Sequence, residues 1–157
     1  MELYLSLLIG FVVLFSSLDA IQNKHYHKVW AHKTMGEKFG LVFYMLFHNV
    51  LFFCIYITFP FILFKYKSIP TRFIGLYLML LIAIPLHWVT NNNQCWFTVQ
   101  QNKLLEIPED AVFRDPYQII FNLYTDGSGS MGFRDKAYYG YLITAMVGTA
   151  YLLAYRM

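Results

Sequence analysis

Charged residues are scarce in this sequence. Asp, Glu, Lys and Arg make up 13% of the 157 residues, about half of the roughly 25% in an average soluble domain. Hydrophobic residues make up 58%. So few charges do not suit the surface of a soluble enzyme, and a disordered tail carries many more charges and far fewer apolar residues. The composition therefore excludes both classes.

Cysteine is also scarce, and familiar catalytic motifs are missing. Cys54 and Cys95 are too few for a disulfide-stapled secreted domain. The sequence contains no G-x-S-x-G, H-E-x-x-H or Walker motif. Gly127, Gly129 and Gly132 match G-x-G-x-x-G formally, but no strand and no βαβ unit surround them, so we interpret them as a flexible turn. No basic face is present, which excludes nucleic acid as a partner.

Long apolar runs are what the sequence has in abundance. There are four, at Leu3–Ile21, Phe39–Phe64, Phe73–Val89 and Ala137–Tyr155. Each has about 17 residues or more, enough for a helix to cross a hydrocarbon core of roughly 30 Å. The sequence predicts an all-α membrane protein in which four transmembrane helices form a compact bundle. Residues 1–157 then make a single membrane domain, and the loop 90–136 carries one or two short interfacial helices.

Two features predict the topology of these spans. The first run follows Glu2 and no basic residue, so we expect it to be a retained span instead of a cleaved signal peptide. The first and third loops hold eight of the twelve basic residues: Lys24, Lys28, Lys33, Lys38, Lys103, Arg114, Arg134 and Lys136. The positive-inside rule therefore places these two loops in the cytoplasm.

Small residues recur at helix-packing spacing in two places. Gly140, Thr144 and Gly148 repeat every four residues in the fourth run, and Gly36 and Gly40 do so before the second. Such stripes let another helix approach closely. We favour packing inside the bundle. A homo-oligomer or docking on another membrane protein is the alternative.

Four carboxyl, imidazole or amide side chains lie within the spans, where each costs free energy and marks a functional candidate. Asp19, His48, Asn49 and His87 fall in the half of the bilayer that faces loops one and three, next to the polar run 91–94 and Cys95. Two histidines could ligate a haem iron, or His48 and Asp19 could relay a proton. We favour a third interpretation, in which these groups bond one another and fix the helix packing, so we predict no catalytic residue, metal or cofactor.

The third loop contains two candidate helix starts, Pro108 and Asp115–Pro116, where Asp would be the N-cap and Pro the first helical residue. The second predicts an apolar helix over Pro116–Tyr124. Such a helix lies on the membrane or docks on another protein. The docking candidates on it are Pro116, Tyr117, Ile120, Leu123 and Tyr124.

The stretch 87–98 reads HWVTNNNQCWFT. It resembles the "HW, NNN, C, then LT" signature of small multi-pass membrane proteins of nucleocytoplasmic large DNA viruses. It is also distantly similar to a bacterial membrane family with a Trp…Cys-Pro-Leu-Thr motif. The resemblance covers Leu86 to Tyr124 and is carried by His87, Trp88, Asn91, Asn92, Asn93, Cys95 and Thr98.

This chain departs from the signature at two points. Phe97 stands in place of Leu, and Gln100–Gln101 stand where an acidic residue is expected. If that acid takes part in a reaction, this chain lacks it. The viral family has no established activity, so the resemblance implies a setting: a viral internal membrane, or the host endoplasmic reticulum from which it derives.

The resemblance leads us to expect a structural virion membrane protein. Its partners would be the lipid bilayer and capsid or minor capsid proteins, contacted by loops one and three, and the motif would fold back over the end of the bundle. Two other classes stay open. One is a small membrane redox or haem-binding enzyme, and the other is a transporter lined by the same polar residues.

Overall fold

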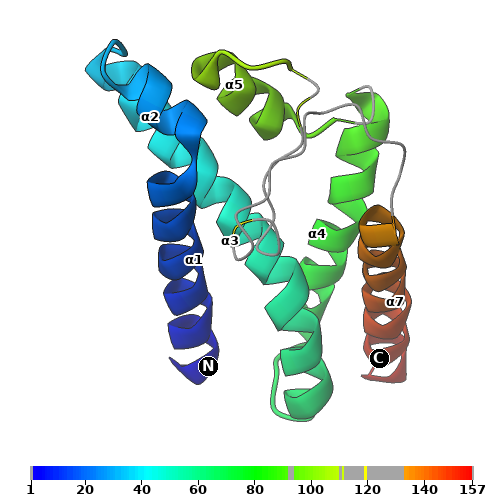
Figure 1. Cartoon of the computed structure of the whole chain (residues 1–157). Helices are drawn as coiled ribbons and strands as arrows, with labels where there is room; N and C mark the ends of the chain where they lie inside the picture. The colour runs from blue at the N-terminus through cyan, green and yellow to red at the C-terminus, as the bar shows by residue number, and fades with distance from the viewer. Residues whose placement is uncertain (1, 92–93, 110, 112–118, 120–132, 157) are drawn as a thin grey trace.

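The computed structural model describes residues 2–91, 94–109, 111, 119 and 133–156, with backbone alone for 133–137. Within these ranges every regular element is a helix (Figure 1). The helices are α1 (Glu2–Gln22), α2 (Lys24–Trp30), α3 (Met35–Lys65), α4 (Thr71–Thr90), α5 (Trp96–Leu105) and α7 (Phe133–Arg156). The prediction of an all-helical protein is confirmed for this part of the chain.

Three of these helices, α1, α3 and α4, are long and apolar enough to cross a membrane. They correspond to the first three apolar runs, so the membrane character predicted from the sequence is confirmed. Among the described helices, α7 is not one of these candidate spans, so a fourth transmembrane helix is not confirmed. The sequence of α7 contains five tyrosines and carries Arg134, Asp135 and Lys136 in its first turn, which make it less apolar than the other three.

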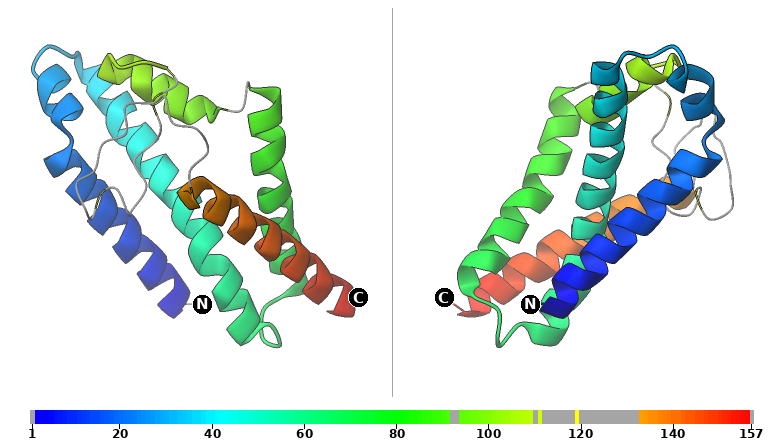
Figure 2. Two further views of the ribbon diagram at one scale, coloured as in Figure 1. Left: turned by 45° about the vertical axis from the view of Figure 1, so that its right-hand side comes forward. Right: turned by 90° about the vertical axis from the view of Figure 1, so that its left-hand side faces the viewer.

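The long helix α3 is central to the arrangement. Helix α1 packs along one side of α3, and α4 packs against α7. Figure 1 shows α3 and α4 joined by a turn at one end of the molecule and diverging toward the other end, where α5 lies. Both chain termini lie at the end that holds the α3–α4 turn (Figures 1 and 2).

The start of α3 follows from local capping chemistry. The Thr34 hydroxyl accepts a hydrogen bond from the Glu37 N–H at 3.4 Å, and the Glu37 carboxylate accepts one from the Thr34 N–H at 2.9 Å. This reciprocal pair satisfies two backbone donors that a helix start leaves unpaired. It explains why α3 begins at Met35 and not at Phe39, where the apolar run begins.

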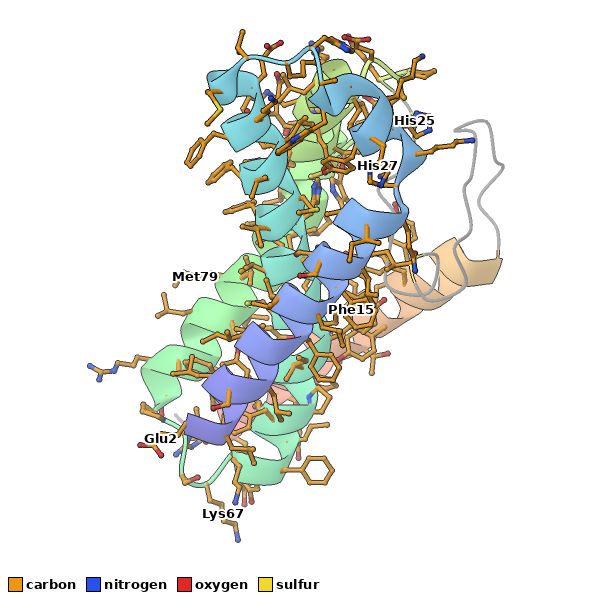
Figure 3. The ribbon with its side chains drawn as sticks, turned by 60° about the vertical axis from the view of Figure 1, so that its left-hand side comes forward. Glu2, Phe15, His25, His27, Lys67 and Met79 are labelled. Carbon is orange, nitrogen blue, oxygen red and sulfur yellow. The ribbon has the colours of Figure 1, made fainter. Side chains whose placement is uncertain are left out.

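Apolar side chains form three buried clusters. The largest joins α3, α4 and α7, the second joins α2, α3 and α5, and the third lies between α1 and α3 around Phe15 and Phe53. Many other apolar side chains point outward, as Met79 does in Figure 3. In a bilayer these outward side chains meet lipid tails, so their exposure carries no hydrophobic penalty.

The small-residue stripes divide into two groups. A Cβ added at Gly148 would lie 2.7 Å from the Phe59 ring, and one at Gly40 would lie 3.1 Å from Leu104. Gly140 and Gly36 have no such neighbour within 4 Å, and the Thr144 hydroxyl bonds the Gly140 carbonyl of its own helix. Packing inside the bundle thus accounts for Gly148 and Gly40, while Gly140, Thr144 and Gly36 face outward.

Candidate functional site

Helix α5 carries Thr98 of the motif and begins directly after Cys95. The motif was expected to fold back over the end of the bundle; in the structure the chain turns at Asn91 and forms a helix from Trp96 to Leu105. Its buried residues are Thr98, Val99, Gln101, Asn102 and Leu105. Because residues three and four apart share one helix face, this spacing turns three polar side chains toward the rest of the protein.

His48 lies at the centre of the candidate site. Its ring is buried, with 7% of the residue exposed. The Nε2 atom lies 3.2 Å from the Cys95 Sγ and 2.9 Å from the Thr98 Oγ1. His48 therefore meets Cys95 and Thr98, which follow it by 47 and 50 positions in the sequence, where α3 and α5 are in contact.

A second set of polar groups adjoins the first. Gln101 Nε2 donates to the Tyr26 hydroxyl at 2.7 Å, and the Gln101 side chain also lies beside the His48 ring. Burial, together with the nearby Asp19 carboxylate, raises the pKa of Tyr26, and the hydrogen bond from Gln101 opposes this shift. Tyr26 therefore keeps its proton at neutral pH. Asp19 itself is only 1% exposed.

Asn49 joins α1 to α3 next to this site. Its side-chain Nδ2 donates to the Ser16 hydroxyl at 2.8 Å and to the Met45 carbonyl at 3.2 Å. The residue is fully buried. Asp19, His48 and Asn49 thus lie at the same end of the bundle, the end covered by α5.

His87 has a different role from His48. Its Nε2 accepts a hydrogen bond from the Trp96 backbone N–H at 3.0 Å. A helix start leaves its first N–H groups without helical partners, so His87 satisfies one of these groups for α5. The Nε2 atoms of His48 and His87 are each bonded to a different protein group, an arrangement that does not favour shared ligation of a haem iron.

The other motif residues shape the turn between α4 and α5. Asn91 Nδ2 donates to the Gln94 carbonyl at 2.9 Å. The Trp88 ring packs against those of Tyr138 and Tyr139, with centroids 5.8 Å and 5.7 Å away. Asn92 and Asn93 lie outside the described residues.

Ion pairs lie at the C-terminal end of α5, where Glu106 is the C-cap residue. Glu106 Oε1 lies 3.0 Å from His32 Nε2 and 2.9 Å from Lys33 Nζ. Hydrogen bonds and charge from these two residues lower the pKa of Glu106 to about 2. Lys103 pairs with Glu109 at 3.5 Å. The Glu106 contacts tie the end of α5 to the loop between α2 and α3, and the Lys103–Glu109 pair joins α5 to the turn that follows it.

Two expectations for the third loop have different outcomes. The helix start expected at Pro108 is wrong, because Pro108 and Glu109 lie in a turn that the Ala111 N–H closes by donating to the Pro108 carbonyl at 3.0 Å. Asn102 Nδ2 also donates to the Glu109 and Ala111 carbonyls. The docking candidates Pro116, Tyr117, Ile120, Leu123 and Tyr124 lie outside the described residues. Ile119, between them, is fully buried against Phe15 and Phe53.

His27 and His32 of the first loop bond different groups, so they do not form a cluster. His27 Nε2 lies 2.7 Å from the Ile21 carbonyl, and His32 pairs with Glu106. Figure 3 shows His25 and His27 at the end of the molecule opposite Glu2 and Lys67. Among the residues that the structure describes, no three His, Cys, Asp or Glu side chains come together as a metal site would require.

Sequence reasoning missed Ser16, Tyr26 and Gln101 as members of the site. Tyr26 resembles an interfacial anchor in sequence, and Gln101 was noted only as a departure from the viral signature. The spacing of Thr98, Gln101 and Leu105 is the signal that could have found α5 and its buried face.

Comparisons of the chain with protein-family models, curated proteins and solved structures found no match.

Proposed function

We propose that this chain is a structural integral membrane protein of a viral internal membrane, which anchors the bilayer to capsid or minor capsid proteins. One observation carries the structural role: the motif side chains bond within the chain and fix α5 over one end of the bundle. His87 bonds the start of α5, and Thr98 joins α5 to His48 of α3. The viral setting is supported by the resemblance of residues 87–98 to the viral signature.

The outer face of the α5 end suits a protein partner. His32, Lys103, Glu106 and Glu109 each leave about half of the side chain exposed. They present both signs of charge where the apolar helices end. A mixed-charge surface of this kind is complementary to a mixed-charge protein surface, and complementarity of charge favours one partner and one orientation over others.

We also propose that α7 is the fourth transmembrane helix. Its 24 residues span about 36 Å at roughly 1.5 Å per residue, which is longer than a hydrocarbon core of roughly 30 Å. Its last turn is tied to the α3–α4 turn, because the Arg156 guanidinium donates to the Ile69 and Lys67 carbonyls.

Quantitative mass spectrometry with amine cross-linking on purified particles of the source virus tests the anchoring role. We expect hundreds of copies per particle, and cross-links from Lys103 to shell proteins. Lys67, at the opposite end of the bundle (Figure 3), is the internal control and should give none. Shell cross-links from Lys67 instead of Lys103 would show that the wrong end has been assigned to the shell.

Absence from particles, with abundance in infected-cell membranes, would contradict the anchoring role. It would favour the alternative of a small membrane redox or haem-binding enzyme or a transporter. The contact between His48 and Cys95 would then be the first place to look for that activity. Absorbance of the purified protein at the haem bands would identify the haem-binding case.

A further inference from the structure

A groove among three of the helices has no part in the anchoring role. It is lined by Tyr4 of α1, by Cys54 and Thr58 of α3, and by Phe73, Leu76, Tyr77 and Leu80 of α4. The groove is open on one side, and Leu76 at its edge is 64% exposed. Because α1, α3 and α4 are the three candidate spans, this opening faces lipid. The groove lies in the half of the bundle next to the α3–α4 turn, the end that Glu2 and Lys67 mark in Figure 3.

Two buried hydroxyls in this groove are bonded to each other. The Tyr4 hydroxyl lies 2.7 Å from the Thr58 hydroxyl, and the two residues are 6% and 2% exposed. Each hydroxyl carries one hydrogen, and the bond between them uses only one of the two. Thr90 and Thr144, by contrast, donate to carbonyls of their own helices. Tyr4 also lies beside Cys54, but sulfur is a weak acceptor. Among the described residues, one O–H group of the pair therefore lacks an oxygen acceptor.

The volume and the lining of the groove restrict the ligand that it can take. The volume is about 210 Å³, below the roughly 300 Å³ at which sites that enclose a whole drug-sized molecule begin. The groove can therefore hold one face of a lipid molecule whose other face stays in the bilayer. The lining side chains are aromatic or apolar apart from the hydroxyls and the thiol, and none is charged. This lining suits a hydrocarbon body, and the O–H group suits one oxygen on that body.

Among membrane lipids, a sterol meets these requirements. Its flat ring system is rigid and carries one hydroxyl, so it loses little conformational freedom on binding. An acyl chain is flexible and has no oxygen along its length. The depth also fits. Thr58 lies seven residues before Lys65, the last residue of α3, which is about 10 Å at roughly 1.5 Å per residue. In a hydrocarbon core of roughly 30 Å, this is the outer part of one leaflet, where the hydroxyl end of a sterol lies.

We propose that this groove binds a sterol from the surrounding membrane. The sterol oxygen accepts the unused hydrogen of the Tyr4–Thr58 pair, and one face of the ring system lies against the α4 side of the groove. The sequence agrees with this assignment. Arg72, Tyr77 and Leu80 follow one another with four and two residues between them, an order that fits one of the patterns proposed for cholesterol contact. Such patterns are weak by themselves, so the argument depends on the groove and its hydroxyl pair.

Photo-cross-linking of the full chain in phosphatidylcholine nanodiscs tests the site, with a cholesterol that carries a diazirine and an alkyne as the probe. We expect saturable labelling of peptides that line the groove, and unlabelled cholesterol should displace the probe. Leu76→Trp fills the edge of the groove and should abolish the saturable labelling. Met79→Trp is the matched control and should label as the wild type does, because Met79 is 66% exposed on the same helix and does not line the groove.

Three competitors test the role of the hydroxyl pair. Cholesterol and cholestenone each carry an oxygen that can accept the unused hydrogen, and cholestane carries none. We expect the first two to compete about two- to ten-fold better than cholestane, the effect of one hydrogen bond. This preference should disappear in the double variant Tyr4→Phe/Thr58→Val, which removes both hydroxyls and nearly keeps the side-chain volumes. Each variant is first checked for a monodisperse size-exclusion profile, and the competition on the wild type needs no variant.

Labelling that does not saturate, or that stays at the wild-type level in Leu76→Trp, would overturn the proposal. Competition by oleate as strong as that by cholesterol would also overturn it, because the groove would then take an acyl chain. Equal competition by cholestane and cholesterol would show that the hydroxyl pair does not bind the sterol oxygen. The anchoring role is tested separately, because it predicts particle copy number and cross-links whichever lipid is bound.

Discussion

Asn49 illustrates how a polar residue is accommodated inside an apolar helix. Its amide nitrogen is shared between the Ser16 hydroxyl of α1 and the Met45 carbonyl of its own helix. Its Oδ1 atom has no partner among the described residues. A half-satisfied amide stabilises less than a fully bonded one, so this contact specifies which face of α1 meets α3 more than it adds stability.

The Asn49–Ser16 bond should show a small coupling energy in a double-mutant cycle. We expect Ser16→Ala, Asn49→Ala and the double variant to give a coupling of about 0.6 kcal/mol, the average for hydrogen bonds between transmembrane helices, and no more than about 1.7 kcal/mol, the largest such value. The measurement is reversible unfolding in mixed micelles. A coupling near zero would show that the bond does not form, and the Phe15→Leu variant, which leaves both polar groups intact, serves as a control for loss of packing.

The ion pairs of Glu106, at the C-terminal end of α5, should make the stability of the protein depend on pH. Its pKa is lowered from 4.5 to about 2 because Lys33 and His32 bond its carboxylate. A lowered pKa in the folded state means that the contribution of this carboxylate to stability is present above about pH 4.5 and is lost as the pH falls toward 2. Because Glu106 is exposed, solvent screens the effect and keeps it small.

A carbon-13 NMR titration of the Glu106 carboxyl group in micelles checks this prediction. We expect a midpoint near pH 2 in the wild type and a midpoint closer to 4.5 in Lys33→Ala. Lys103→Ala is the matched control, since Lys103 pairs with Glu109 and not with Glu106. A wild-type midpoint at the ordinary value would mean that the ion pair with Lys33 does not persist in solution.

At the scale of elements, long apolar runs were predictable and short helices were not. The first three spans agree with α1, α3 and α4 within a few residues, because twenty apolar residues have few alternatives to a helix in a membrane. Helix α5 has ten residues and a mixed composition, and its stability depends on contacts with α2 and α3. Tertiary contacts of this kind decide short helices, and sequence periodicity alone does not contain them.

The contact of α7 with α3 predicts a difference between two glycines of one stripe. In Gly148→Ala the new methyl group would lie 2.7 Å and 2.9 Å from two atoms of the Phe59 ring, so the ring or the helix must shift. We expect a destabilisation of about 1 to 3 kcal/mol, as for other overpacked cores. Gly140→Ala adds a methyl group to open space and should not destabilise the protein.

Thermal unfolding of the two variants in the same detergent distinguishes them. Both substitutions make the same change in helix propensity, so the difference between their midpoints isolates the contact with Phe59. Phe59→Leu in the Gly148→Ala background should recover part of the loss, because the smaller side chain makes room. Equal midpoints for Gly148→Ala and Gly140→Ala would show that α7 does not pack on α3 at this position.

At the scale of the whole molecule, three polar residues of the first two spans lie toward one end. Asp19, His48 and Asn49 were expected in the same half of the bilayer from the alternation of the spans, and the structure places all three at the α5 end. The sequence could indicate that these residues lie at a similar depth in the membrane, because depth follows from counting residues along each span. It could not indicate that His48 contacts Cys95 while His87 bonds Trp96, because the rotation of each helix depends on side-chain packing.

The structure places the two termini and the α3–α4 turn at one end and α5 at the other (Figure 1), which predicts a topology that distinguishes three spans from four. With α7 as a fourth span, epitopes at the N-terminus, at the C-terminus and after Lys67 lie on one side of the membrane. An epitope after Lys28 lies on the other side, in the cytoplasm by the positive-inside rule. With three spans only, the C-terminal epitope changes sides and joins the one after Lys28.

Protease protection in sealed vesicles measures all four epitopes, and the one after Lys67 is the internal reference because it follows α3 in either case. A C-terminal epitope on the side of Lys28 would therefore contradict the fourth span and leave α1, α3 and α4 as the membrane-crossing helices.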